Sequence, residues 1–311
     1  PNLMNAYENM TWTDEIRKGN GQAPLFENIK DGYLDGTINR DQYGDTNWMD
    51  VVFRSVAPQT RHSLSISGGS EKVKFYVSGD YSYQEPNYRN TSLDFQTGQV
   101  RSNIDARITE NLKVGVDLAV RKEKRNGSVI PTKSIFWEAF MAYPWLYDYY
   151  PNGLPGPGLS NGNNLAILVA GKETGYNKVS DVFLDSKFTF DLQLPWITKG
   201  LSLSGYAAFD YHAREQKQLW DGWDTYNYNS NTQEYDKKTT NMNGNTISLL
   251  QDHDVSMTRT YHLKLDYQRT FGDHRVGAFV AYEQSEFEGE NFYGWRGYDL
   301  SNLPDYLDFG A

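Results

Sequence analysis

The chain has 311 residues, a formal net charge of −10 and a mean hydropathy of −0.70, and 15% of its residues are aromatic. The negative charge and the lack of any basic run exclude a nucleic-acid partner, because binding to a phosphate backbone needs a basic surface. No stretch approaches the roughly 18 apolar residues of a membrane helix, and the absence of cysteine excludes thiolate chemistry.

A chain that is polar on average yet rich in aromatics is typical of sheets with one apolar and one wet face. Two classes of protein fit this composition. One is a secreted β-sandwich with an aromatic binding surface. The other is a membrane β-barrel, which must be closed because open sheet edges cannot face lipid.

Residues 1–59 are expected to form helix and loop. Apolar residues at helical spacing predict a helix over Leu3–Arg17. Many Gly, Asp and Asn residues then indicate a loop over Lys18–Asp45, and a further helical turn is expected over Trp48–Phe53.

From residue 60 the pattern changes to strict alternation of apolar and polar side chains, which indicates half-buried strands. About eight strands of about ten residues are expected, the length that crosses a bilayer core when tilted. Their ranges are Arg61–Gly68, Val73–Tyr83, Val100–Thr109, Lys113–Arg121, Leu184–Gln193, Leu201–Tyr211, Tyr261–Gln268 and Val276–Tyr282.

The connections between these strands alternate in length. Short links occur at Gly69, Glu110, Pro195 and Gly272. Long loops are expected over residues 85–97, 122–178 and 215–256, and a further one is expected to start at 289–311. In an up-and-down barrel, this alternation places all short turns on one rim and all long loops on the other, as in outer-membrane barrels. The predicted fold class is therefore all-β, as part of an antiparallel up-and-down transmembrane β-barrel with periplasmic turns and extracellular loops.

Three features favour an arc of a larger barrel over a complete eight-stranded one. The chain begins at Pro1 with about sixty residues of helix and loop that a small barrel does not need. It ends inside a loop at Ala311. Pro1 is also an implausible natural start. Without neighbouring strands, the two edges of such an arc would be open, which lipid does not tolerate. We therefore expect residues 60–288 to be one arc of the wall.

Several runs resemble the SusC/RagA family of TonB-dependent outer-membrane transporters of Bacteroidetes. Asp45-Thr46-Asn47-Trp48-Met49-Asp50 resembles the family's TDW-x-D stretch, and Leu64-Ser65-Ile66-Ser67-Gly68-Gly69-Ser70-Glu71-Lys72 resembles its LSISGGSEK hairpin. Pro1 to Glu8 resembles the segment just after the plug domain and the first barrel strand. The specific matches cover roughly the first half of the chain; beyond Gly175 only the strand pattern is alike.

This resemblance implies a barrel of about 22 strands, plugged by an N-terminal domain. It implies a SusD-like surface lipoprotein as a lid, TonB as a partner through the missing plug region, and a place in the outer membrane in contact with its lipid. The function it implies is TonB-dependent nutrient import. The aromatic-rich loops favour oligosaccharide; the alternatives are a peptide importer of the same family and a non-transporting adhesion barrel.

Aromatic residues gather in two of the long loops and are the candidates for contact with a substrate or a lid. They are Trp137, Trp145, Tyr147 and Tyr149 in one loop, and Trp220, Trp223 and Tyr226 in the other. The alternative is that they form a packed loop core or an interfacial belt. Asp221 and Asp224 lie beside the second group, where solvated acids are favoured over a calcium site because the EF-hand spacing is missing.

No catalytic residues, cofactor or metal are expected. The five histidines are dispersed, and no HExxH, GxSxG or phosphate-binding loop occurs. Charges expected on the lumen face include Lys74, Asp105, Lys187 and Asp191, and cross-strand hydrogen bonding on a wet barrel wall explains them more simply than catalysis does.

Overall fold

A computed structural model describes residues 3–158, 163–171, 173–240 and 247–298. Eight strands form one antiparallel sheet in which neighbours along the chain are paired, except that β6 pairs with β9. The strands are β1 (Gln59–Gly69), β2 (Val73–Gln84), β3 (Asp94–Arg107), β4 (Leu112–Gly127), β5 (Gly175–Gln193), β6 (Leu201–Trp220), β9 (Ile247–Phe271) and β10 (His274–Tyr298). The expected eight strands and their up-and-down order are confirmed.

The register of the strands produces two chemically different faces. On one face, Val116 of β4 lies opposite Phe188 of β5; on the other, Asp117 lies opposite Lys187. The same alternation runs through the other pairs, because successive side chains in a strand point to opposite sides of the sheet. In a transmembrane barrel the apolar face meets lipid and the polar face lines the lumen.

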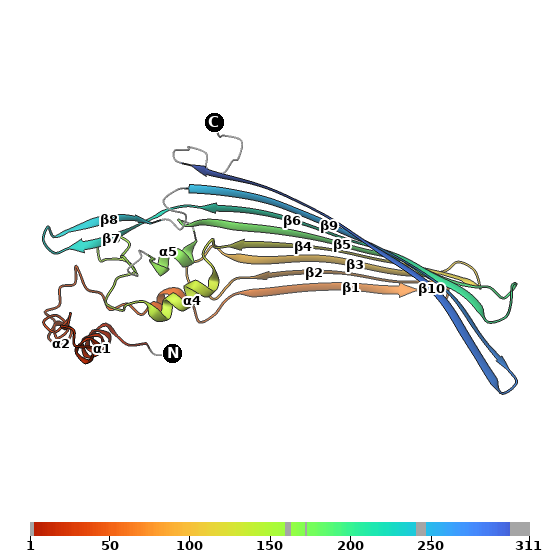
Figure 1. Cartoon of the computed structure of the whole chain (residues 1–311), viewed down its shortest axis with the longest axis horizontal. Helices are drawn as coiled ribbons and strands as arrows, with labels where there is room; N and C mark the ends of the chain where they lie inside the picture. Colours follow the sequence, from red (N-terminus) through yellow and green to blue (C-terminus); the bar gives the residue numbers. More distant parts are fainter. Residues whose placement is uncertain (1–2, 159–162, 172, 241–246, 299–311) are drawn as a thin grey trace.

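Short turns and long loops lie at opposite ends of the sheet (Figure 1). The short turns are residues 70–72, 108–111, 194–200 and 272–273, and the long connections are 85–93, 128–174 and 221–246. Within the described ranges, β1 and β10 are the edges of the sheet. The sheet is open rather than closed, as expected for an arc of a larger barrel.

The strands are longer than predicted. β4 continues to Gly127 and β5 begins at Gly175, so the predicted loop 122–178 is shorter at both ends. β10 continues to Tyr298, so the prediction that a loop starts at residue 289 is wrong. Residues 299–311, where the rest of that predicted loop falls, lie outside the described residues. On β4 the reason is that backbone pairing extends past the apolar stretch to Arg121–Arg125, where both faces are charged and alternation no longer signals a strand.

A second, two-stranded sheet lies inside the connection between β6 and β9. Its strands are β7 (Trp223–Asn229) and β8 (Glu234–Thr240). This hairpin projects beyond the large sheet at the long-loop end (Figure 1). It was not predicted, because tyrosines stand on the side of β7 opposite Trp223 and obscure its alternation.

Among the described residues, five helices lie at the long-loop end (Figure 1). They are α1 (Ala6–Gly19), α2 (Gly32–Asp35), α3 (Trp48–Val52), α4 (Thr132–Met141) and α5 (Leu165–Ala170). The predicted helices correspond to α1 and α3. A capping box starts α1: the Glu8 amide donates to Asn5 Oδ1 at 2.8 Å and the Asn5 amide donates to Glu8 Oε2 at 3.0 Å. In the described part of the chain, no helix has both the length and the apolar character needed to cross a bilayer.

Candidate functional site: the loop cap and the polar face

The segments at the long-loop end pack against one another, and we call the whole assembly the loop cap. It comprises residues 3–58, 85–93, 128–158 and 163–171 and the β7–β8 hairpin. The buried members of its core are Trp48, Val52, Tyr88, Ile130, Ile135, Ala139, Ala142, Leu165, Ile167, Leu168, Val169 and Trp223. Because these residues come from segments far apart in sequence, the long loops are packed structure rather than free chain.

The first aromatic contact joins the N-terminal segment to the long loop. The rings of Tyr143 and Trp145 stack at 4.5 Å with an interplanar angle of 14°. Phe26 packs against Trp145 at 4.8 Å, and the Gly44 amide donates to the Trp145 carbonyl oxygen at 2.8 Å. One side of Trp145 is therefore already occupied by the protein.

A second contact chain of tyrosines joins the long loop to the hairpin. Tyr150 lies 5.0 Å from Tyr147 and 4.7 Å from Tyr235 between ring centres. The Tyr147 hydroxyl donates to the Arg40 carbonyl oxygen at 2.7 Å, and the Tyr150 hydroxyl oxygen accepts from the Tyr228 amide at 3.3 Å. Burial raises the pKa of Tyr150 to about 12, so this hydroxyl stays protonated well into the alkaline range.

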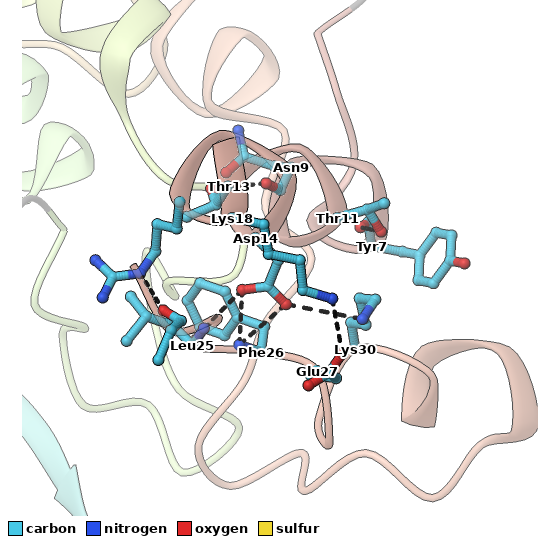
Figure 2. A network of polar contacts seen from close by, with 12 residues as sticks. Tyr7, Asn9, Thr11, Thr13, Asp14, Lys18, Leu25, Phe26, Glu27 and Lys30 are labelled. Carbon is cyan, nitrogen blue, oxygen red and sulfur yellow. Dashed lines mark hydrogen bonds and ion pairs between the residues drawn. The ribbon is translucent and has the colours of Figure 1, made fainter. Parts of the chain in front are cut away.

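The N-terminal segment is held by a buried carboxylate. Asp14 of α1 is 2% exposed and accepts hydrogen bonds from the amides of Leu25 at 2.7 Å and Phe26 at 3.0 Å. Lys30 Nζ lies 3.7 Å from Asp14 Oδ2. Figure 2 shows these contacts converging beneath α1. They fix the loop that presents Phe26 to Trp145.

The structure separates the predicted site residues into two groups. Trp223 is 2% exposed and belongs to the core of the loop cap, so it offers no ring to a ligand. Trp137 on α4 is 65% exposed, and Tyr149 is also exposed. The remaining candidates are half-buried: Trp145, Tyr147, Trp220 and Tyr226.

The two acids beside the second aromatic group have partners in the protein. Asp224 pairs with Lys237 Nζ at 2.8 Å and accepts from the Thr239 hydroxyl at 2.7 Å. These hydrogen bonds, with the lysine's charge, lower the pKa of Asp224. Asp221 Oδ1 accepts from the Gly222 amide at 2.7 Å. Among the described residues, no group of three His, Cys, Asp or Glu side chains could hold a metal ion.

The polar face of the sheet carries two cross-strand stacks that sequence reasoning missed. Phe183 of β5 is flanked by the Arg121 guanidinium of β4, 4.2 Å from its ring centre, and by the His212 ring of β6 at 4.3 Å. His212 Nε2 lies 2.8 Å from Asp181 Oδ1. Phe183 directly precedes Leu184, so the alternation of β5 places its ring on the polar face. That position in the sequence could have predicted an aromatic ring on the polar face.

The second stack lies nearer the short turns. Tyr206 of β6 stacks on His262 of β9 at 5.1 Å, and Lys187 Nζ lies 4.6 Å from the Tyr206 ring centre. The Tyr206 hydroxyl donates to Glu283 at 3.1 Å, and His262 Nδ1 lies 3.1 Å from the same carboxylate. Aromatic faces beside paired charges give this wall both stacking surfaces and hydrogen-bonding groups.

A hollow of about 600 Å³ opens on the polar face at the short-turn end. Its lining combines cations, carboxylates and aromatic rings, among them Lys74, Asp105, Arg107, Lys113, Asp191 and Tyr206. Such a surface can hydrogen-bond a polar solute. The site residues predicted in the loops and this part of the polar face lie at opposite ends of the sheet.

The amino-acid sequence is similar to those of two bacterial receptors over part of its length. It is 30% identical over 97 residues to TonB-dependent receptor P3 of Formosa agariphila, a match that covers 31% of this chain and 9% of the receptor. It is 26% identical over 147 residues to TonB-dependent receptor P26 of the same organism, covering 44% of this chain and 14% of the receptor. No protein-family model matches the chain.

Solved structures share the fold over the whole chain. The RagAB peptide importer in its closed-closed state superimposes with a TM-score of 0.71 at 18% identity, covering 100% of this chain and 35% of that chain. Its open-open state gives 0.70 at 17% identity. The chain thus spans about a third of the importer chain's length. The predicted resemblance to SusC/RagA-type transporters is confirmed, and the chain has the fold of a stretch of transporter barrel wall.

Proposed function

We propose that this chain forms part of the wall and outer loops of a TonB-dependent importer in the outer membrane of a Gram-negative bacterium of the Bacteroidetes. The proposal rests on the eight-stranded meander with one apolar and one polar face. All of this chain superimposes on 35% of a chain of the RagAB importer. Sequence similarity to two TonB-dependent receptors supports the same function.

In this proposal the short turns face the periplasm and the loop cap faces outside. Residues 1–58 lie on the extracellular side, after the first strand of the whole barrel. The barrel strands of this chain run from β1 to the end of β10 at Tyr298. The polar face, with its stacks at Phe183 and Tyr206, lines the path of the solute. A SusD-like lipoprotein closes over the cap, and TonB acts through the plug region of the whole protein.

Oligosaccharide is the first proposed substrate. Trp137 and Tyr149 expose aromatic rings on the loop cap, and sugar rings stack on such surfaces through their apolar faces. Peptide is the second candidate, because the solved structures with the same fold are those of a peptide importer. A mixed surface such as the polar face can hydrogen-bond either class.

Uptake by the source bacterium tests the proposal. Deleting the whole gene should abolish growth on one oligosaccharide or one peptide mixture as the sole source, and complementation with the full-length gene should restore it. Loss of growth on peptides alone would assign the second candidate. Unchanged uptake on every nutrient together with a loss of surface attachment would replace import with an adhesion role.

A matched pair of tryptophan variants tests the part played by the loop cap. Trp137, 65% exposed, lies at the long-loop end, whereas Trp196, 63% exposed, lies in the turn at the opposite end. In the complemented strain, Trp137→Ala should raise the nutrient concentration that gives half-maximal uptake, and Trp196→Ala should leave it unchanged. Equal effects of both variants would remove Trp137 from the contact surface.

A further inference from the structure

The lipid-facing side of the sheet changes from apolar to basic where three adjacent strands leave their apolar stretch. The apolar stretch on this face ends at Val120 of β4, Val182 of β5 and Ala213 of β6, and on β6 a buried leucine, Leu219, follows beyond the basic position. Lysines follow them on the same face, two or four residues further towards the long-loop end. They are Lys122, Lys124, Lys178 and Lys217, and we call them the lysine patch.

The strand register brings these lysines together. Lys122 lies opposite Val182, and Lys178 lies opposite both Asn126 and Lys217. Neighbouring strands are about 4.8 Å apart and residues rise about 3.3 Å each. The four ammonium groups therefore stem from three adjacent strands, within about 13 Å of the end of the apolar stretch measured along the strand.

Three of the four lysines in this patch lack an acidic partner among the described residues. These three, Lys122, Lys124 and Lys178, are exposed. On the same face, Glu215 is exposed and Asp94 Oδ2 accepts from Asn126 Nδ2 at 2.7 Å. Glu286, Glu288 and Glu290 also lie on this face, but on β10, two strands beyond β6, where Glu288 pairs with Arg259. Like charges directly opposite each other, as in Lys178 and Lys217, destabilise a sheet. The patch is also basic in a chain whose net charge is −10, so an external anion is the expected partner.

The surroundings of the patch fit an amphipathic partner. Tyr81 is exposed on β2, and the register places Gly98 between it and Lys122. A Cβ at Gly98 would meet no atom within 4 Å, so this position is open. Lys178 Nζ lies 4.1 Å from the centre of the Tyr176 ring. Tyrosines and lysines beside an apolar band are typical of the boundary between lipid tails and headgroups.

We propose that the lysine patch binds the phosphate groups of the glycolipid that forms the outer leaflet of the outer membrane. Lysine ammonium groups form charge-assisted hydrogen bonds to phosphate oxygens, and the patch begins directly above the surface that the acyl chains cover. The proposal rests on the outer-membrane location and the outward direction of the long loops given above. It does not depend on which nutrient is imported or on import itself.

Binding of lipid A to the purified full-length protein tests this site. A variant with Lys122, Lys124 and Lys178 changed to Ser is compared with one in which Lys133, Lys199 and Lys238 are changed to Ser. Both sets consist of exposed lysines, and the second set lies outside the patch. The patch variant should bind bisphosphorylated lipid A at least about tenfold more weakly, because each lysine near a charged membrane surface contributes appreciably. The control should bind as the wild type does.

Two further measurements are needed. One distinguishes binding of phosphate from general binding of lipid, and the other distinguishes loss of the site from a folding defect. The wild type should bind dephosphorylated lipid A at least about tenfold more weakly than the bisphosphorylated form, and millimolar inorganic phosphate should not displace the lipid. Changing the same three lysines to Arg should preserve binding. Equal binding by the patch and control variants, or by the two forms of lipid A, would overturn the proposal, as would full displacement by inorganic phosphate. Loss of lipid A binding leaves nutrient uptake as a separate measurement, so the two proposals can fail independently.

Discussion

The Trp48 indole Nε1 donates a hydrogen bond to the Tyr143 carbonyl oxygen at 2.9 Å, although the two residues are 95 positions apart. The Thr46 hydroxyl likewise donates to the Leu146 carbonyl oxygen at 2.6 Å. These bonds attach the segment before β1 to the loop between β4 and β5. The loop cap therefore behaves as one packed unit rather than as independent loops.

Replacing Trp48 with Ala should loosen the loop cap without disrupting the sheet. The side chain is 1% exposed, and removing a buried tryptophan costs about 3–5 kcal/mol through lost packing and the cavity left behind. Hydrogen exchange of the full-length protein should show faster exchange in residues 128–158, with β2 to β6 unchanged. Trp137→Ala removes an equal volume from an exposed position and should leave exchange unaltered. Faster exchange throughout the strands would contradict the division into cap and sheet.

Replacing Asp14 with Ala should release the loop that follows α1. The buried carboxylate accepts the amides of Leu25 and Phe26, and leaving buried donors unsatisfied costs about 1–3 kcal/mol each. Proteolysis of folded protein should cut residues 20–30 faster than in the wild type. Glu15→Ala, on the neighbouring and exposed position, is the control. Equal protection of both variants would show that Asp14 does not hold this loop.

The large sheet could be predicted from the sequence because its information is local. Alternation around Leu64 and Ile66, followed by the run Gly68-Gly69-Ser70-Glu71-Lys72, is enough to define a strand and its reversal. The outer half of β4 is different. Residues Arg121 to Arg125 place charges on both faces of the sheet. Only backbone pairing with β3 and β5 keeps them in a strand, and the sequence shows no alternation of apolar and polar residues there.

The loop cap could not be predicted because its core is non-local. Trp223 and Trp137 look alike in the sequence, since each stands in a long aromatic loop. Trp223 is buried among residues from four other segments of the chain, and Trp137 is exposed. Composition alone cannot tell whether an aromatic ring is exposed to a ligand or buried in the core of the loop cap. The residues that pack against each ring determine which of the two it is. The stack of Tyr206 on His262 likewise needs the β6–β9 pairing, which skips the hairpin between them.

The loop cap should lose stability at alkaline pH through Tyr150. Burial raises the pKa of its hydroxyl to about 12, above the value of about 10 for an exposed tyrosine. A group with a raised folded pKa stabilises the fold below its unfolded pKa, and this contribution is lost as pH rises from about 10 to about 12. Hydrogen exchange in residues 223–240 should therefore accelerate, relative to the intrinsic rate, across that range. Tyr150→Phe should weaken this pH dependence, although the variant also loses the hydrogen bond from the Tyr228 amide. An unchanged pH profile of exchange in this variant would show that another group is responsible.

Single cysteines introduced into this chain test the orientation of the barrel, and the 311 residues add no native thiol to the background. Asn231 lies at the exposed tip of the β7–β8 hairpin, and Glu71 lies in the exposed short turn between β1 and β2. If the long loops face outside, a membrane-impermeant maleimide on whole cells should label Asn231→Cys but not Glu71→Cys. Permeabilising the outer membrane should then make Glu71→Cys reactive, which shows that the site is folded correctly and merely sheltered. Trp223 is unsuitable as an outer marker because it is buried. Labelling of Glu71→Cys before Asn231→Cys on intact cells would reverse the topology, and the lysine patch would then face the inner leaflet.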